Sequence, residues 1–165
     1  MTYDVAIVRQ PLNALFDLKG SSAAIQNWAA DVLSTLPERP NSRSGQASVE
    51  LYHVGRNHWI ARAPLEQEAE LEKRLSPTNC PAEISIVRIS DTLTFFRVTG
   101  PQADEVMSIA CPLDIHETEF GEETVTYTEL FGLKALIMRC EDGFEFAVEQ
   151  SFGDMVEDYL SRAVA

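Results

Sequence analysis

Apolar residues recur at helical spacing in the first quarter of the chain. Between Ser21 and Pro37 they fall at i, i+3, i+4, i+7, i+8 and i+11, which places them on one face of an α-helix. These residues are Ile25, Trp28, Ala29, Val32, Leu33 and Leu36. The hydroxyl of Ser21 can cap the first turn, and Pro37 cannot continue the helix. The pattern therefore predicts a helix that reaches Leu36.

Alternating apolar and polar positions predict strands on both sides of this helix. Pro64 suits the first position of a second helix, and the turn Gly55-Arg56-Asn57 favours a hairpin before it. The predicted strands and second helix span residues 14–18, 47–52, 58–63, 83–89 and 64–75. Their order is that of a ferredoxin-like βαββαβ unit. The turn-rich segment Pro37–Gly45 either contacts a partner or is a plain connector.

The second half mixes strands and helices in another order. Its predicted elements are strand 92–98, helix 101–110, strands 124–130, 133–140 and 143–149, and helix 151–163. The strand at 133–140 is apolar on both faces, which favours a central position in a sheet. We expect an α+β fold in which a βαββαβ half, residues 1–90, packs against a βαβββα half, residues 91–165. The sheets should be largely antiparallel, with the helices on one face of each.

Composition and charge exclude several classes of function. The 165 residues include 13 Lys and Arg against 26 Asp and Glu, a formal charge of −13 that repels nucleic-acid phosphates. Apolar runs are far shorter than the roughly 20 residues that a bilayer requires, and the N-terminus lacks the basic start of a signal peptide. We therefore expect a cytoplasmic protein that binds neither nucleic acid nor membrane.

The residues that most resemble an active site are Cys111-Pro112-Leu113-Asp114-Ile115-His116. Cys111 as a nucleophile with His116 as its base would be a familiar pair. However, Cys111 follows the C-terminus of the predicted helix, where the helix dipole disfavours a thiolate, so a packed structural thiol is the preferred interpretation. The proline disfavours helical geometry at Cys111, so the segment begins as the helix ends.

Other candidate sites are incomplete. His53 and His58 flank the predicted hairpin turn and could begin a metal site, but no third ligand follows from the spacing. Asp114 and Glu117 could act as paired carboxylates, although solvated loop charges explain them better in so acidic a chain. The sequence contains no glycine-rich dinucleotide motif, P-loop or nucleophile elbow. No catalytic, cofactor-binding or metal-binding residue is assigned.

A series of short motifs resembles the gamma subunit of heterotetrameric sarcosine oxidase. The motifs occur in order and at compatible spacing along most of the chain. They are Phe16-Asp17-Leu18-Lys19-Gly20, Pro40-Asn41-Ser42-Arg43-Ser44-Gly45, Gly55-Arg56-Asn57-His58-Trp59, Ala63-Pro64, Ile89-Ser90-Asp91, Val98-Thr99-Gly100-Pro101, the segment 111–116 and Glu149-Gln150-Ser151-Phe152. Gln150 departs from the family, which commonly has a basic residue there. The turn before Trp59 also departs.

The resemblance implies an accessory subunit of a bacterial flavoenzyme that oxidatively demethylates sarcosine to glycine and passes the one-carbon unit to tetrahydrofolate. It implies that FAD, FMN, NAD and tetrahydrofolate bind the larger subunits, with alpha, beta and delta chains as partners. It also implies that the second half resembles the folate-binding fold of aminomethyltransferases. Candidate partner-contact residues are Arg43, Trp59, Cys111, Pro112, Asp114 and His116.

Two other classes of function remain open. A free-standing folate-binding or aminomethyltransferase-like module follows from the same family relationship, and a cysteine enzyme would use Cys111. A related complex acting on another N-methylated amine would keep the fold and change positions such as Gln150.

Overall fold

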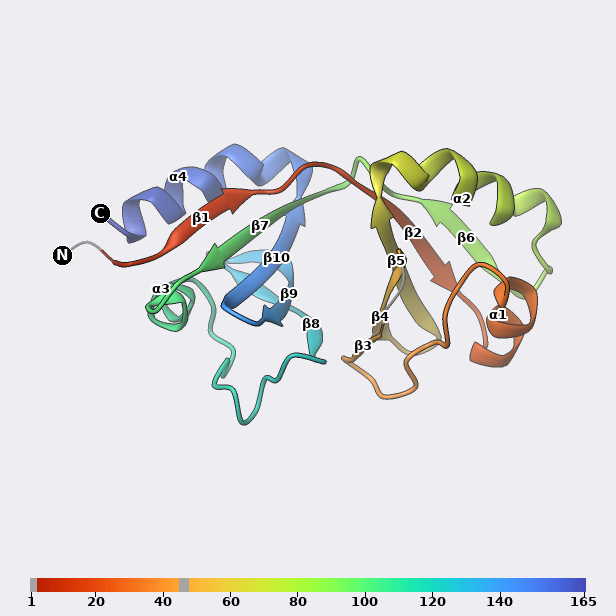
Figure 1. The fold of residues 1–165 in the computed structure, drawn as a ribbon, viewed down its shortest axis with the longest axis horizontal. Helices are drawn as coiled ribbons and strands as arrows, with labels where there is room; N and C mark the ends of the chain where they lie inside the picture. The colour runs from red at the N-terminus through yellow and green to blue at the C-terminus, as the bar shows by residue number, and fades with distance from the viewer. Residues whose placement is uncertain (1–2, 45–47) are drawn as a thin grey trace. The chain divides into compact units, whose positions relative to one another are not determined.

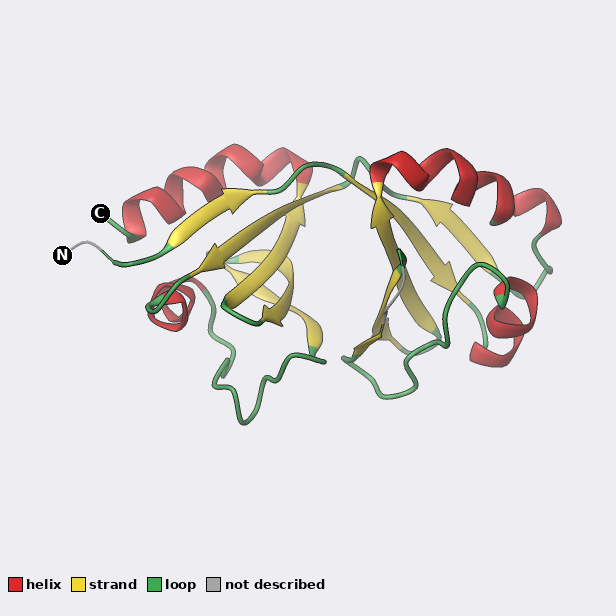
Figure 2. Ribbon diagram, viewed as in Figure 1, coloured by secondary structure: helices red, strands yellow, loops and turns green. Residues whose placement is uncertain are grey.

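The computed structural model describes residues 3–44 and 48–165 (Figure 1). Gly45 and Ala47, at the end of the predicted loop and the start of the predicted strand, lie outside the described residues. The chain divides into two compact units. The central unit is Leu12–Ser90, and the terminal unit joins the segment ending at Pro11 to Asp91–Ala165. Each unit has a five-stranded sheet and two α-helices (Figure 2).

The central unit has the predicted order of elements and one more strand, β3 (Arg43–Ser44), which lies within the segment predicted as a loop. Its elements are β2 (Asn13–Lys19), α1 (Ser22–Ala29), β3, β4 (Glu50–Gly55), β5 (His58–Pro64), α2 (Glu68–Arg74) and β6 (Ser85–Arg88). The sheet order is β3-β4-β5-β2-β6, and all neighbouring strands are antiparallel. Without the two-residue β3, this is the order of a split βαβ unit, in which β2 and β5 are the inner strands. The ferredoxin-like prediction for these residues is confirmed.

The helix predicted to reach Leu36 is shorter than its apolar pattern. α1 ends at Ala29, and the chain then folds back, with the Leu36 N–H donating to the Gln26 side-chain oxygen at 2.9 Å. Leu33 and Leu36 remain buried in the core although they are no longer helical. Helical spacing continued past the end of the helix because both segments face the same core.

Both helices of the central unit cover the same face of its sheet. The core cluster draws residues from α1 and α2 and from alternate positions of the strands. Its largest members include Phe16, Leu18, Ile25, Leu51, Trp59, Leu71 and Leu75. This arrangement confirms the expectation of helices on one face.

The terminal unit contains the predicted βαβββα order and one strand that was not predicted. Its elements are β1 (Ala6–Arg9), β7 (Leu93–Thr99), α3 (Ala103–Ala110), β8 (Val125–Leu130), β9 (Leu133–Cys140), β10 (Gly143–Glu149) and α4 (Gly153–Ala163). The sheet order is β1-β7-β10-β9-β8, again antiparallel. The strand 133–140 was predicted to be central and is indeed an inner strand, but β10 occupies the middle position.

The strand β1 carries the N-terminal segment into the terminal unit. It pairs with β7, and the guanidinium of Arg9 lies 2.7 Å from Asp154 and 3.6 Å from Glu157 of α4. The order of elements along the sequence predicts that all of residues 1–90 belong to the first half. The observed pairing joins residues up to Pro11 to the second half instead. The position of a short edge strand depends on the strand that it pairs with, which here lies far away in the chain.

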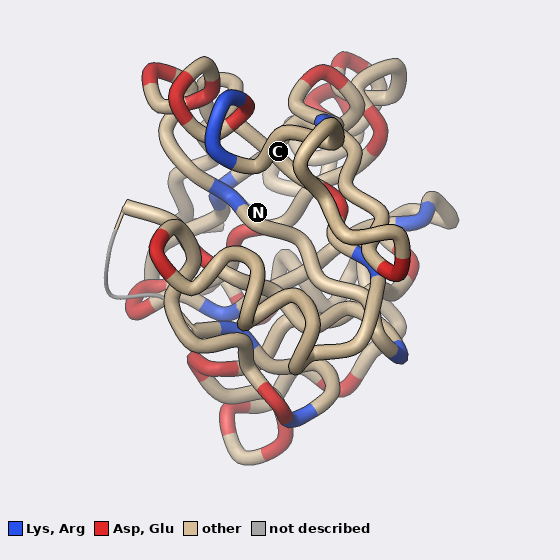
Figure 3. Tube along the Cα trace, turned by 90° about the vertical axis from the view of Figure 1, so that its right-hand side faces the viewer, with Lys and Arg blue, Asp and Glu red and all other residues tan. Residues whose placement is uncertain are grey.

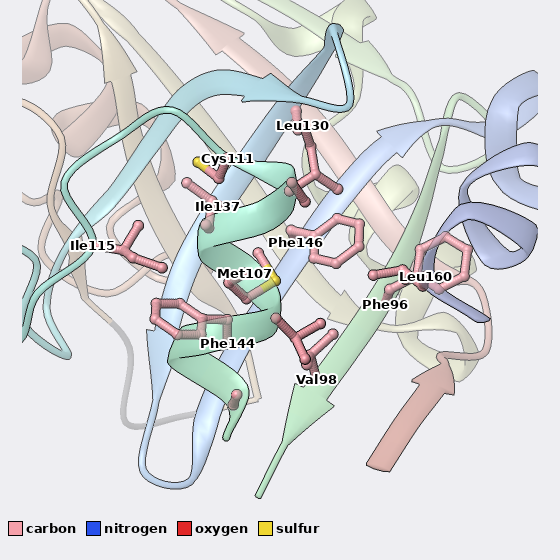
Figure 4. Packing of buried hydrophobic residues seen from close by; sticks show 14 of the residues in the cluster. Phe96, Val98, Met107, Cys111, Ile115, Leu130, Ile137, Phe144, Phe146 and Leu160 are labelled. Carbon is pink, nitrogen blue, oxygen red and sulfur yellow. The ribbon is translucent and has the colours of Figure 1, made fainter. Parts of the chain in front are cut away.

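The core of the terminal unit lies between one face of its sheet and the two helices. In Figure 4, Met107 of α3 lies between Phe144 and Phe146 of β10, and Leu160 of α4 lies beside Phe96 of β7. The rings of Phe96 and Phe146 stack with centroids 5.5 Å apart. Among the described helices, none is both long and apolar enough to cross a membrane.

Candidate functional site

The segment 111–116 forms an anchored turn after α3. Cys111 is extended, with φ −119° and ψ 125°, and its N–H donates to Met107. The side chains of Cys111 and Ile115 are buried in the core, whereas Pro112, Asp114 and His116 are exposed. The extended residue before the proline agrees with the predicted end of the helix. The turn therefore presents three of its six side chains to solvent.

Hydrogen bonds within the loop fix the exposed residues. The carboxylate of Asp114 accepts the N–H of His116 at 3.1 Å. The carbonyl of His116 accepts the N–H groups of Glu119 and Phe120 at 2.9 and 2.8 Å, and its ring Nδ1 lies 3.0 Å from the Thr118 hydroxyl. His116 is thus engaged with its own loop while the Cys111 thiol is in the core. The structure does not assemble them as a nucleophile and a base.

Arg139 of β9 holds the loop against the sheet. Its Nε donates to the Phe120 carbonyl at 2.7 Å, and one terminal nitrogen donates to the Ile115 carbonyl and lies 3.1 Å from Asp104 of α3. The guanidinium also lies 4.5 Å from the centre of the Phe144 ring. Only 12% of its side chain is exposed. Charge-assisted bonds of this kind are stronger than neutral ones, so Arg139 is the main polar anchor of the loop.

An open hollow of about 750 Å³ lies beside this anchor in the terminal unit. Its lining includes one basic side chain, Arg139, and five acidic ones: Asp4, Asp104, Glu117, Glu141 and Asp142. Acidic residues also outnumber basic ones along the trace in Figure 3. The electrostatic potential of the hollow therefore favours positively charged groups over anions. The carboxylates of Asp114 and Glu117 differ in setting, because Asp114 caps the turn and Glu117 lines the hollow.

A second hollow, of about 530 Å³, lies elsewhere in the terminal unit. Its lining includes Tyr127, Lys134, Glu149 and Gln150. The Lys134 ammonium lies 4.2 Å from the centre of the Tyr127 ring, a cation–π contact. The lining also contains two acidic residues, Asp91 and Glu149, so this hollow offers an aromatic ring but no excess of positive charge.

In the central unit, His53 and Trp59 anchor the segment that includes Arg43. Their rings stack with centroids 4.7 Å apart, the Trp59 indole donates to the Pro37 carbonyl at 3.1 Å, and His53 Nδ1 lies 3.1 Å from the Arg39 carbonyl. Arg43 lies in β3 opposite Tyr52 and is half-buried. The buried rings of His53 and Trp59 therefore hold the backbone of Pro37 and Arg39, just before β3, in place.

The hairpin does not bring His53 and His58 together. His53 pairs with Trp59 across the strands, and a bulge after His53 places His58 opposite Gly55. His58 Nε2 instead contacts the Asp17 carboxylate. The possibility that the two imidazoles begin a metal site is therefore wrong. Within residues 3–44 and 48–165, no group of three or more His, Cys, Asp or Glu side chains could hold a metal ion.

A buried tyrosine lies on the face of the central sheet that the helices do not cover. The Tyr52 hydroxyl donates to the Glu50 carboxylate and accepts from Arg62 at 3.2 Å. Burial raises the pKa of Tyr52 well above its usual value of 10.0; the Glu50 carboxylate adds to this shift and the Arg62 charge opposes it. Tyr52 therefore stays protonated in the folded chain at pH values where an unfolded tyrosine ionises.

This difference predicts alkaline instability. Above pH of about 10 the unfolded chain releases the Tyr52 proton and the folded chain retains it, so the free energy of unfolding should fall by up to about 1.4 kcal/mol per pH unit. Below that pH this contribution is fully present. Urea unfolding between pH 8 and 11 measures the slope. In Tyr52→Phe the slope should become shallower by that amount, and an unchanged slope would contradict the assignment.

The six predicted contact residues occupy two kinds of position. Pro112, Asp114 and His116 are exposed and Arg43 is half-buried, so all four are accessible to a partner. Trp59 and Cys111 are 2% and 4% exposed, and they shape the surface from below. Arg139 was missed by the sequence analysis. The available signal was a basic residue within the otherwise apolar run 135–140.

The fold and these surfaces define a two-unit α+β protein whose chain resembles solved structures over nearly its whole length. A chain of the heterotetrameric sarcosine oxidase from Corynebacterium sp. U-96 matches with a TM-score of 0.81 and 21% identity, over 97% of this chain and 83% of that one. No protein-family model matches the sequence, and no curated protein matches it. The likeness to the sarcosine oxidase chain establishes a shared fold.

Two other solved structures also match this chain. The aminomethyltransferase T of the glycine cleavage system from Bartonella henselae matches with a TM-score of 0.69 and 16% identity. That match covers 96% of this chain but 46% of the aminomethyltransferase. The regulatory subunit of aspartate kinase from Thermus thermophilus matches with a TM-score of 0.52 and 13% identity, over 100% of both chains.

Proposed function

We propose that this chain is a non-catalytic subunit, equivalent to the gamma subunit, of a multisubunit flavin-dependent sarcosine oxidase. The complex would oxidise sarcosine to glycine and pass the one-carbon unit to tetrahydrofolate. The observation that carries the proposal is coverage: the likeness spans 83% of the sarcosine oxidase chain and only 46% of the aminomethyltransferase. The chain thus matches the former in size as well as in fold.

The ordered sequence motifs support the same assignment independently of the fold. The motif at 111–116 forms an anchored turn that presents Pro112, Asp114 and His116 on the surface. In the proposed complex these residues contact a larger subunit, and the buried Cys111 supports them from within the terminal unit. Trp59 supports a separate candidate contact, the segment of the central unit that includes Arg43. The flavins, NAD and folate would be held by the larger subunits. The proposed complex is cytoplasmic.

Co-expression tests this proposal directly. The chain should be produced together with candidate alpha, beta and delta subunits and purified through an affinity tag on this chain alone. We expect it to co-elute in size exclusion with chains that carry flavin absorbance, in a constant ratio. Elution of this chain alone, with each candidate set properly folded, would contradict the proposal.

A second candidate function is a free-standing folate-binding module. It is favoured by the hollow in which Lys134 lies against the Tyr127 ring, together with the fold shared with aminomethyltransferase T. A pterin that stacks on the Tyr127 ring would displace the Lys134 ammonium from it, and the ammonium would then pair with a carboxylate of the ligand. Titration calorimetry of the isolated chain with tetrahydrofolate distinguishes the two functions. A binding heat that Lys134→Ala abolishes would favour this second candidate.

A further inference from the structure

Apolar side chains are exposed where α3, the β8–β9 turn and α4 meet. Ile109 of α3 is 53% exposed and Tyr159 of α4 is 38% exposed. The Phe131 ring packs edge-on against Tyr159 with centroids 5.4 Å apart. The Phe131 N–H donates to the carbonyl of Ala110, the residue after Ile109, at 2.8 Å. Ile109, Phe131 and Tyr159 are called the Phe131 patch below.

The backbone at Phe131 is unusual for so large a residue. Phe131 and Gly132 form the two-residue turn between β8 and β9, with φ values of 51° and 78°. Such turns favour Asn-Gly or Asp-Gly, because a bulky side chain is strained at positive φ. An asparagine would form the same turn with less strain, but it would lack the partly buried ring that packs against the core of the unit and against Tyr159. Strained positions of this kind are concentrated at functional sites.

The surroundings of the patch indicate the charge of what it binds. Glu105 is exposed one helical turn before Ile109, on the same side of α3. Beside Tyr159 on α4, the Arg162 guanidinium is already bonded to Asp158 at 2.8 Å. The chain as a whole carries a formal charge of −13. A partner surface that combines apolar side chains with lysine or arginine is complementary to this region.

From these observations we infer that the Phe131 patch is a docking surface for a protein partner whose contact region places apolar side chains between basic ones. The inference rests on the proposed function, in which that partner is a larger subunit of the complex. It extends the predicted contact surface, because Pro112 follows Ile109 by three residues and is itself exposed. Aromatic side chains in such positions commonly supply much of the binding energy of an interface.

The test compares two aspartate substitutions at equally exposed apolar positions of the terminal unit, with Tyr159→Ser as a second variant of the patch. Ile109→Asp alters the patch, and Val8→Asp adds the same charge on β1, where Val8 is 52% exposed. Each variant and the wild-type chain are immobilised, and binding of the purified flavin-bearing subunits is measured by interferometry. We expect Ile109→Asp and Tyr159→Ser to raise Kd at least about tenfold and Val8→Asp to change it less than about threefold. Melting curves check that each variant is folded.

The charge of the partner is tested separately. Glu105→Lys should weaken binding of the same subunits and reduce its dependence on salt, because it removes a favourable charge from the patch. Glu105→Gln should have an intermediate effect. Unchanged or tighter binding by Glu105→Lys would overturn the assignment of a basic partner surface.

The remaining outcomes separate this inference from the proposed function. If the wild-type chain binds the flavin-bearing subunits and the Ile109 and Tyr159 variants bind equally well, the docking surface is wrong and the proposed function stands. If the wild-type chain binds none of them, both fail. If the variants instead abolish self-association of the isolated chain, a second copy covers the patch and the inference is overturned.

Discussion

Val106→Asp should destabilise the terminal unit by about 4 kcal/mol or more, a large share of the roughly 5–15 kcal/mol that holds a typical domain folded. Val106 is 0% exposed and lies on the inner face of α3, in the core cluster with Met107 and Phe146. The substitution removes buried apolar area and places a carboxylate where it has no hydrogen-bond partner or counter-ion. Urea unfolding followed by circular dichroism measures the loss.

Two further variants serve as controls for this prediction. Ser108→Asp places the same carboxylate on the exposed side of α3, two residues away, and should cost no more than about 1 kcal/mol. Val106→Ala removes only methyl groups and should cost about 2 kcal/mol. This milder variant should stay folded, so its free energy of unfolding can be measured even if Val106→Asp does not fold. Equal stability of Val106→Asp and Ser108→Asp would show that the inner face of α3 is misassigned.

Arg139→Met should cost about 3 kcal/mol and should loosen the loop that follows α3. The methionine keeps much of the side-chain volume over Phe144 but leaves the carbonyls of Ile115 and Phe120 without their charged donor. Urea unfolding gives the stability. Amide hydrogen exchange gives the local effect, because the N–H groups of Glu119 and Phe120 that donate to His116 should lose protection before the core strands do.

Arg162→Met is the matched control for this change. Arg162 forms an i,i+4 ion pair with Asp158 on α4, and 75% of its side chain is exposed. Solvent screens such pairs, so the variant should lose no more than about 0.5 kcal/mol. If the Arg139 and Arg162 variants have similar stability and similar exchange in the loop, Arg139 does not anchor the turn.

Much of the fold could be predicted because its signals are local. The hairpin of β8 and β9 and the strand β10 follow from short turns between β-forming runs, and α3 follows from an apolar stripe that ends before Pro112. The split βαβ order followed from the succession of elements. Local sequence also placed Cys111 at the end of a helix, because proline restricts the residue before it.

Other features depend on contacts between residues far apart in the chain. α1 ends at Ala29 because the chain folds back and the Gln26 side chain binds the backbone of Leu36, although apolar spacing continues to Leu36. β1 has only four residues and forms against β7, about 90 positions away. No periodicity within the short segment before Pro11 could reveal that partner.

The candidate functional site also combines features that local sequence predicts with features that depend on distant contacts. The segment 111–116 was recognisable by its residue types, and its identity as a turn followed from the proline. The anchor Arg139, the separation of Cys111 from His116, the exposure of Ile109 and the contact of Phe131 with Tyr159 became visible only in three dimensions. These contacts join elements that lie tens of residues apart in the chain.

The sequence by itself determined the α+β class, the order of nearly all elements and the acidic surface, because backbone propensity, apolar period and charge are local or additive properties. The tertiary structure decided where the N-terminal segment belongs, which side chains of the turn reach solvent and which apolar residues remain uncovered. Those outcomes depend on which distant segments pack together. Whether a residue is buried or exposed depends on the segment that covers it, and local sequence does not specify that segment.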